Sequence, residues 1–347
     1  MTKSGKMHPR YNSGIQRSKG LLEIAAALYD TSLSRQSRRS GTPAPQIDSR
    51  LGTRLSLRID AKKARTDDSV GISFGVDGFR DNILQVARKE LSLLWINPNV
   101  PLAQAYKGCP PFSKPLPLRA VAVFPSWDAV VIAVHESTGI RSIEEIRERR
   151  YPLRVSTRDT IAPPFDEDTT MFAVSTILAA AGFSLDDIRR WGGSIHSVTR
   201  PSHPDRSDAI SKGTVDAIFD EGILSWGQFA LEHGFRILPI EGSVRERMKV
   251  AGYDIGTLTQ SRLPGLLAPV PAIDFSGWPM IVHAEMPEDV AYALCEAIEG
   301  RKLLIPTDNY RPLDLAQLCS ITEETPRGAP LHPGAERFYR ERGYLRE

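Results

Sequence analysis

Two stretches of this sequence share one pattern: a helix-like run, a short apolar run and a polar loop. In the first, residues 80–90 precede an apolar run and the polar loop 97–99. In the second, residues 208–213 precede an apolar run and the polar loop 220–222. Loops after the strands of α/β folds bring strand ends and helix N-termini together, with backbone donors free to bind a ligand. The pattern therefore predicts a binding cleft with one such loop on each side.

The length of 347 residues predicts two domains, since one domain ordinarily holds about 100 to 200 residues. Strand-like and helix-like runs alternate along the chain, which is typical of an α/β class with mostly parallel sheets. We expect two lobes joined by a hinge. The predicted segments are a basic N-terminal helix and linker (1–52), lobe 1 (53–150), lobe 2 (151–270), and return strands with C-terminal helices and tail (271–347).

The net charge of +2 gives no whole-molecule field that would favour nucleic acid or membrane. Residues 1–54 hold 10 Lys+Arg against 3 Asp+Glu, leaving 34 against 39 in the rest. This basic segment could be a nucleic-acid arm, but it lacks interleaved aromatics, so a solvated terminus is the preferred interpretation. Three scattered cysteines and seven histidines without metal-ligand spacing predict neither a metal site nor a cofactor.

Several stretches in order resemble one known family. They are the Gly-rich turn opening a helix at 75–82, the helix ending in Ala-Tyr-x-Gly at 101–108, the paired strands and Ser-capped helix of 118–150, the Gly-x-x-Asp-Ala segment at 213–220 and the tail at 330–343. Their order and spacing resemble the TAXI-type solute receptors of tripartite (TRAP) transporters, which have the type II periplasmic binding-protein fold. The resemblance covers roughly residues 70–345. It implies noncatalytic capture of a small anionic or zwitterionic metabolite for a membrane permease.

The chain departs from that family in two places. Members normally have an export signal and a first strand ending in a Gly-rich loop with a ligand-holding Tyr, whereas this chain has only Tyr11-Asn12-Ser13-Gly14 ahead of its first helix. After Ser156 the loop is longer and more acidic than the family's. The resemblance implies a periplasmic location. The printed sequence shows no signal peptide, so a cytoplasmic location is the expectation if Met1 is the true start.

An anion site needs donors already fixed in place, and helix N-termini near 77–82 and 168–170 would supply them. Arg158 could hold a carboxylate with two parallel hydrogen bonds, or could instead pair with Asp159 or Asp166. Asp220 and Glu221 would suit a ligand ammonium or hydroxyl. The predicted ligand-binding residues are Asp77, Gly78, Asn82, Asn97, Asn99, Ser126, Trp127, Ser156, Thr157, Arg158, Thr169, Thr170, Asp220 and Glu221.

Two other functions share the predicted cleft. One is an enzyme built on the same fold, similar to a decarboxylase or a thiamine-pyrimidine synthase, with the acids at 166–168 or 220–221 in an acid/base role. The other is a cytosolic ligand sensor. Neither Gly-x-Ser-x-Gly nor a P-loop occurs in the sequence. We expect a non-enzyme that binds a small molecule, acts as a monomer or weak homo-oligomer and has a TRAP-type permease as its partner.

Overall fold

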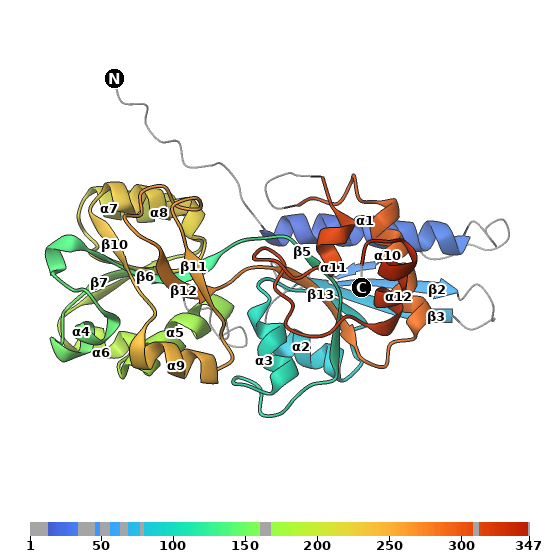
Figure 1. Ribbon diagram of the computed structural model, residues 1–347, viewed down its shortest axis with the longest axis horizontal. Helices are drawn as coiled ribbons and strands as arrows, with labels where there is room; N and C mark the ends of the chain where they lie inside the picture. Colours follow the sequence, from blue (N-terminus) through green and yellow to red (C-terminus); the bar gives the residue numbers. More distant parts are fainter. Residues whose placement is uncertain are drawn as a thin grey trace, which may run out of the picture. The chain divides into compact units, whose positions relative to one another are not determined.

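In the computed structural model, the protein consists of two compact units (Figure 1). The central unit is Asp128–Phe275, and the terminal unit combines Asn12–Trp127 with Ser276–Glu347. The chain passes from one unit to the other after Trp127 and again after Phe275. The structure describes residues 13–33, 46–48, 56–62, 69–76, 80–159, 168–307 and 312–345.

The elements of the terminal unit come from both ends of the chain. They are α1 (Ser13–Leu33), β1 (Gln46–Asp48), β2 (Ser56–Lys62), β3 (Ser69–Val76), α2 (Arg80–Ala87), β4 (Leu93–Trp95), α3 (Val100–Lys107), β5 (Leu118–Phe124), β13 (Trp278–His283), α10 (Glu288–Gly300), α11 (Leu315–Cys319) and α12 (Pro333–Glu341). Its six strands form one sheet in the order β1-β2-β3-β4-β13-β5.

Large aromatic side chains fill the core of the terminal unit. The Trp95 and Phe124 ring centroids are 4.1 Å apart, and Trp95 Nε1 donates a 3.1 Å hydrogen bond to the Trp278 carbonyl. Both tryptophans are buried, so most of their large surfaces are removed from water, which is the main source of stabilisation here. The tail joins this core because the Ala120 carbonyl accepts from the His332 amide at 2.8 Å.

The elements of the central unit alternate between strand and helix. They are β6 (Ala129–His135), the 3₁₀ turn η1 (Glu136–Thr138), α4 (Ile143–Glu148), β7 (Arg154–Arg158), α5 (Thr169–Ala181), α6 (Leu185–Arg190), β8 (Ser194–Val198), α7 (Pro204–Ser211), β9 (Ala217–Asp220), α8 (Ile223–Glu232), β10 (Phe235–Leu238), α9 (Gly242–Val250), β11 (Ile255–Leu258) and β12 (Val270–Asp274). Figure 1 shows α7 and α8 on one side of this unit's sheet and α4, α5, α6 and α9 on the other.

The sheet of the central unit runs β11-β12-β6-β9-β7-β8, and β10 pairs with β6 beyond the end of β12. Strands β8, β7 and β9 are parallel, so their carboxyl ends lie at one edge of the sheet. Strand β6 is antiparallel to β9, with Val131 opposite Asp220. The start of β6 therefore lies at the same edge as the ends of β7 and β9.

The two units share one topological feature. In each, the first strand after the chain enters the unit lies antiparallel between two others: β6 between β9 and β10, and β13 between β4 and β5. The fold is therefore α/β with two units, as expected. The expectation of mostly parallel sheets is wrong. The sheets are mixed because β6, β13 and the outer strands run antiparallel to their neighbours.

The first crossing between units lies earlier in the chain than the predicted start of lobe 2 at residue 151. Residues 128–150 lie in the central unit with 151–275. The reason is that β6, which is a continuous apolar run in the sequence, pairs with β9 and β10 rather than with β5. The second crossing falls after Phe275, close to the predicted position at 270/271.

Local sequence signals explain the helix that follows β7. Asp168 precedes α5, and its Oδ1 accepts a 2.9 Å hydrogen bond from the Met171 amide. Gly182 ends the helix with a φ of 84°, a left-handed conformation that glycine adopts without a side-chain clash. The predicted helix N-terminus near 168–170 is thus confirmed. Among the helices of the described residues, none combines the length and apolar character needed to cross a bilayer.

Candidate functional site

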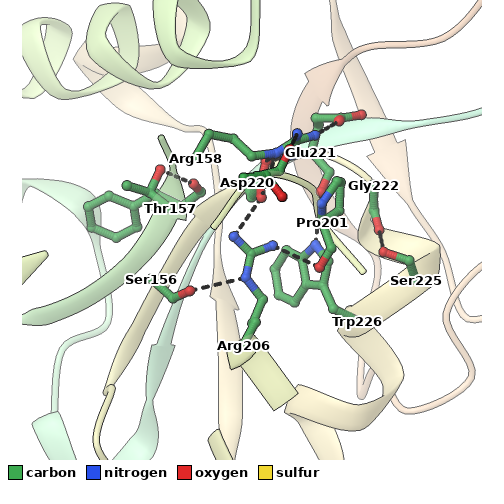
Figure 2. Close-up of polar contacts among 12 residues, drawn as sticks. Ser156, Thr157, Arg158, Pro201, Arg206, Asp220, Glu221, Gly222, Ser225 and Trp226 are labelled. Carbon is green, nitrogen blue, oxygen red and sulfur yellow. Dashed lines mark hydrogen bonds and ion pairs between the residues drawn. The ribbon is translucent and has the colours of Figure 1, made fainter. Parts of the chain in front are cut away.

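A group of charged side chains lies where β7 and β9 end in the central unit (Figure 2). Arg158 is the last residue of β7, and Asp220 is the last residue of β9. Arg158 Nε donates to both oxygens of Asp220, at 2.9 and 3.1 Å. The parallel pairing of the two strands brings these residues together although they are 62 positions apart in the sequence.

Asp220 is fully buried between two guanidinium groups. Arg206, from α7, lies 2.6 Å from the second Asp220 oxygen, measured from its Nη2. The side chains of Arg206 and Asp220 are 1% and 0% exposed. A buried carboxylate of this kind is stable only when cations and hydrogen bonds replace water, and both arginines fill that role.

Arg206 is held from several directions. Its Nε donates to Ser156 Oγ at 3.1 Å and its Nη1 to the Pro201 carbonyl at 3.1 Å. The guanidinium carbon lies 5.7 Å from the centre of the Trp226 ring, a cation–π distance. Burial lowers the pKa of Arg206, and attraction to Asp220 opposes this shift. The geometry fixes Arg206 beneath the Arg158–Asp220 pair.

Arg158 contacts a second carboxylate as well. Its Nη2 donates to Glu221 Oε1, and its Nη1 donates to the Thr199 carbonyl at 3.2 Å. Burial disfavours the charged guanidinium, but Asp220 and Glu221 outweigh this effect, so the pKa of Arg158 is raised. Of the pairings that sequence reasoning considered, the one with Asp159 is not formed, and Arg158 pairs with Asp220 and Glu221 instead. Asp166 itself lies outside the described residues.

Asp128, the first residue of the central unit, connects the start of β6 to the loop after β9. Its two oxygens each accept from the Gly222 amide at 3.0 Å, and Oδ1 also accepts from the Ala129 amide at 2.7 Å. Burial raises the pKa of Asp128 well above its usual range, and the neighbouring Glu221 raises it further through its charge and a hydrogen bond. Asp128 and Glu221 therefore form a carboxyl pair in which Asp128 keeps its proton to a higher pH than an ordinary aspartic acid.

The other predicted residues of the central unit support this group. Thr157 is fully buried, and its Oγ1 donates to the Phe219 carbonyl at 2.7 Å, which ties β7 to β9. Thr169 and Thr170 open α5, and Thr170 is buried. Burial also raises the pKa of Asp168, the residue that caps α5, while Arg158 opposes the shift. Ser156, Arg158, Asp220 and Glu221 are brought together, whereas Thr157 has a structural role.

The predicted residues of the terminal unit that the structure describes form no comparable group of ionised side chains. Asn99 is buried, and its Oδ1 accepts from the Gly328 amide at 2.8 Å, so it anchors the tail. Ser126 is buried and its amide donates to the Glu324 carbonyl at 2.9 Å. Asn82 is buried in the first turn of α2. Asn97 and Trp127 are partly buried, and Asp77 and Gly78 lie outside the described residues.

Sequence reasoning missed Arg206 and Asp128. The signal for Arg206 was its spacing in α7, since it shares a helix face with the buried residues Ala209 and Ile210. An arginine on the apolar face of a helix predicts a buried ion pair. The signal for Asp128 was its position directly before the continuous apolar run of β6.

The group at the ends of β7 and β9 contains two cations and several acids but no metal-ligand arrangement. No three His, Cys, Asp or Glu side chains are placed to hold a metal ion within the described ranges. The chemistry available is charge pairing and hydrogen bonding to a small polar molecule. The partly exposed part of the group is Arg158 and Glu221, whose side chains are 14% and 18% exposed.

Comparison with known proteins found no matching family model. The solved structures that match include a TctC solute binding protein from Polaromonas, with a TM-score of 0.34 and 10% identity, covering 84% of this chain and 81% of that one. The L-cystine solute receptor of Neisseria gonorrhoeae matches with a TM-score of 0.25 and 10% identity over 65% of this chain and 68% of that one.

The periplasmic aliphatic sulphonate binding protein of Escherichia coli matches with a TM-score of 0.30 and 16% identity. That match covers 64% of this chain and 60% of the sulphonate protein, which is less than two thirds of its length. All three are similar to this chain at TM-scores too low to assign it a family, a ligand or a partner.

Proposed function

We propose that this protein binds a small solute carrying a carboxylate or similar anionic group, with Arg158 as the residue that contacts it. The observation that carries the proposal is the position of Arg158: a partly exposed guanidinium, fixed by hydrogen bonds, at the carboxyl end of a parallel strand. Ligands of open α/β sheets bind at such ends. A planar guanidinium also matches the geometry of a carboxylate.

The acidic neighbours of Arg158 narrow the class of solute. Glu221 and Asp168 lie close enough to influence the pKa of Arg158, and both carry negative charge when ionised. A ligand ammonium or hydroxyl would therefore be attracted beside the carboxylate, as in an amino acid or a hydroxy acid. The proposed solute is anionic or zwitterionic.

The finer part of the proposal concerns transport. The sequence resemblance to TAXI-type receptors supports a role in delivering the solute to a TRAP-type permease in the periplasm, without catalysis. Fractionation of cells expressing the full-length gene, followed by immunoblotting, tests the location. Recovery of all the protein with cytoplasmic markers would contradict a periplasmic role and favour the sensor.

A thermal-shift screen of amino acids, dicarboxylates and small aromatic acids tests binding. A solute at about 100 times its dissociation constant adds about 2.7 kcal/mol to the free energy of unfolding, a measurable rise in melting temperature. Arg158→Ala should weaken the best anionic hit by about tenfold or more, because a charge-assisted contact is lost. The variant should still fold, since Asp220 keeps its ion pair with Arg206.

Arg190→Ala is the matched control for this screen. Arg190 also pairs with an acid, Asp187, but its side chain is 68% exposed on α6. Its loss should leave the affinity unchanged. Equal affinities for wild type, Arg158→Ala and Arg190→Ala would remove Arg158 from the binding site.

The carboxyl pair of Asp128 and Glu221 favours one second candidate, an enzyme. A carboxyl group with a raised pKa beside a second carboxyl group is an arrangement that acid/base enzymes use. If a compound in the screen is consumed, product analysis by mass spectrometry will detect turnover. If the compound is turned over and Asp128→Asn abolishes the turnover, the protein is an enzyme and the receptor proposal is wrong.

A further inference from the structure

All three nitrogens of the Arg158 guanidinium already have acceptors inside the protein. Nε donates to Asp220, Nη1 to the Thr199 carbonyl and Nη2 to Glu221. Two carboxylates, those of Asp220 and Glu221, therefore already share this one guanidinium. Although a guanidinium has five N–H groups, a third carboxylate would add like charge beside these two, so a solute anion competes with them for Arg158.

Side-chain exposure identifies which acceptor can be replaced. The Asp220 side chain is 0% exposed, whereas the Glu221 side chain is 18% exposed and Arg158 is 14% exposed. Asp220 also has its own second cation in the buried Arg206. Displacing Asp220 would take one of two cations from a fully buried carboxylate, which costs more than taking Arg158 from the partly exposed Glu221.

Glu221 has a second polar neighbour to receive it. Asp128 contacts the Glu221 carboxyl through a hydrogen bond, and the Asp128 carboxyl is itself anchored by the Ala129 and Gly222 amides. The charged and titratable groups that face this pair are Asp128 at the start of β6, Arg158 on β7, Asp168 at the start of α5, Arg206 on α7 and Asp220 on β9.

We propose that Glu221 is an internal competitor for Arg158, and that a solute carboxylate binds by replacing Glu221 on Nη2. This inference rests on the proposed function and adds its regulation. Asp220, Arg206 and the remaining donors of Arg158 stay in place during the exchange. The displaced Glu221 carboxylate stays hydrogen-bonded, because it accepts a hydrogen bond from the carboxyl group of Asp128.

The exchange predicts a pH dependence of known sign. Because the pKa of Asp128 is raised, the pair loses its proton as pH rises through that pKa. Two ionised carboxylates then repel each other, Glu221 is held more strongly by Arg158, and the group becomes more negative. Affinity for a carboxylate solute therefore falls as pH rises.

Isothermal titration calorimetry tests this with the carboxylate that gives the largest thermal shift, or with succinate if none does. Titrations are run from about pH 5 to about pH 8 on wild type, Glu221→Gln and Asp128→Asn. Glu246→Gln is the control, because it changes the net charge of the protein by the same amount as Glu221→Gln. Glu246 lies on α9, pairs with Lys249 and is 69% exposed. Circular dichroism of each variant checks that it is folded.

The expected result is that wild type and Glu246→Gln bind more weakly at the high end of this range, by up to about tenfold for each pH unit above the pKa of Asp128. Glu221→Gln should bind more tightly than wild type at high pH and lose most of the pH dependence, and Asp128→Asn should also flatten it. If wild type and Glu221→Gln bound the solute with the same affinity and the same pH dependence of affinity, Glu221 would not compete for Arg158. Absence of saturable carboxylate binding to wild type and Glu221→Gln alike would instead overturn the proposed function, and the competitor with it.

Discussion

The polar residues after β7 and β9 in the central unit differ from those after β4 and β5 in the terminal unit. Arg158 and Asp220 join a network of ionised side chains that includes the buried Arg206. Asn99 and Ser126 instead make single hydrogen bonds to the backbone of the C-terminal segment. Both sets follow strands in the same kind of fold.

The difference shows that polar residues in similar positions after a strand can have very different partners. A neutral amide such as Asn99 is satisfied by one backbone partner and can be buried at little cost. A charged side chain needs a partner of opposite charge, and each partner brings further polar groups. The region that collects charges is therefore the one with chemistry to offer a solute.

The largest effect is expected from Arg206→Met. The substitution keeps the apolar stem but leaves Asp220, which is fully buried, with Arg158 alone. Breaking a buried ion pair in this way costs about 3 to 5 kcal/mol. Urea unfolding followed by fluorescence will measure the loss, and Arg190→Ala should change stability by less than about 0.5 kcal/mol. If Arg206→Met changed stability only slightly, the charged network of the central unit would contribute no more to stability than the single hydrogen bonds of the terminal unit.

A smaller loss is expected from Asn99→Ala in the terminal unit. The change leaves the Gly328 amide without its 2.8 Å acceptor, which costs about 1 to 3 kcal/mol. A side chain at Gly328 would meet the Ala103 backbone nitrogen at 2.6 Å, so the segment is too closely packed to move aside. Affinity for the solute should stay the same. If Asn99→Ala abolished binding at unchanged stability, Asn99 would be a ligand contact.

The smallest effect concerns pH and Asp128→Asn. The pKa of Asp128 is raised on folding, so the native state keeps a proton that the unfolded state releases above about pH 3.9. Stability therefore falls as pH rises from that value to the folded pKa, by about 1.4 kcal/mol for each unit between the two. Asp128→Asn should remove this part of the dependence of stability on pH, measured as the urea midpoint of unfolding at several pH values. An identical slope in both proteins would contradict the carboxyl pair.

Much of the fold could be predicted because local signals define its elements. The residues of α5 lie between an acidic cap and a glycine, and the apolar runs of β5 and β6 are continuous. Strand direction was less accessible. Nothing local in Val131 or Ile132 indicates that β6 is antiparallel to β9, because that pairing joins residues almost ninety positions apart.

The candidate site could be predicted only in part. Ser156, Arg158 and Asp220 were identified because they end or adjoin apolar runs. Their partners depend on tertiary pairing: the spacing of Arg206 with Ala209 and Ile210 indicates burial, but nothing local names Asp220 on β9 as its partner. Asp128 gained its role from the loop at Gly222, 94 positions away.

Nitrogen-15 NMR of the arginine side chains offers the most direct measurement of the central claim. Titration with the best carboxylate of the screen should shift the Arg158 Nε resonance in a saturable way, at the same concentrations that raise the melting temperature. The Arg206 Nε resonance should shift much less, because its contacts to Ser156 and Asp220 persist. Saturable binding that leaves the Arg158 resonance unmoved would contradict the account.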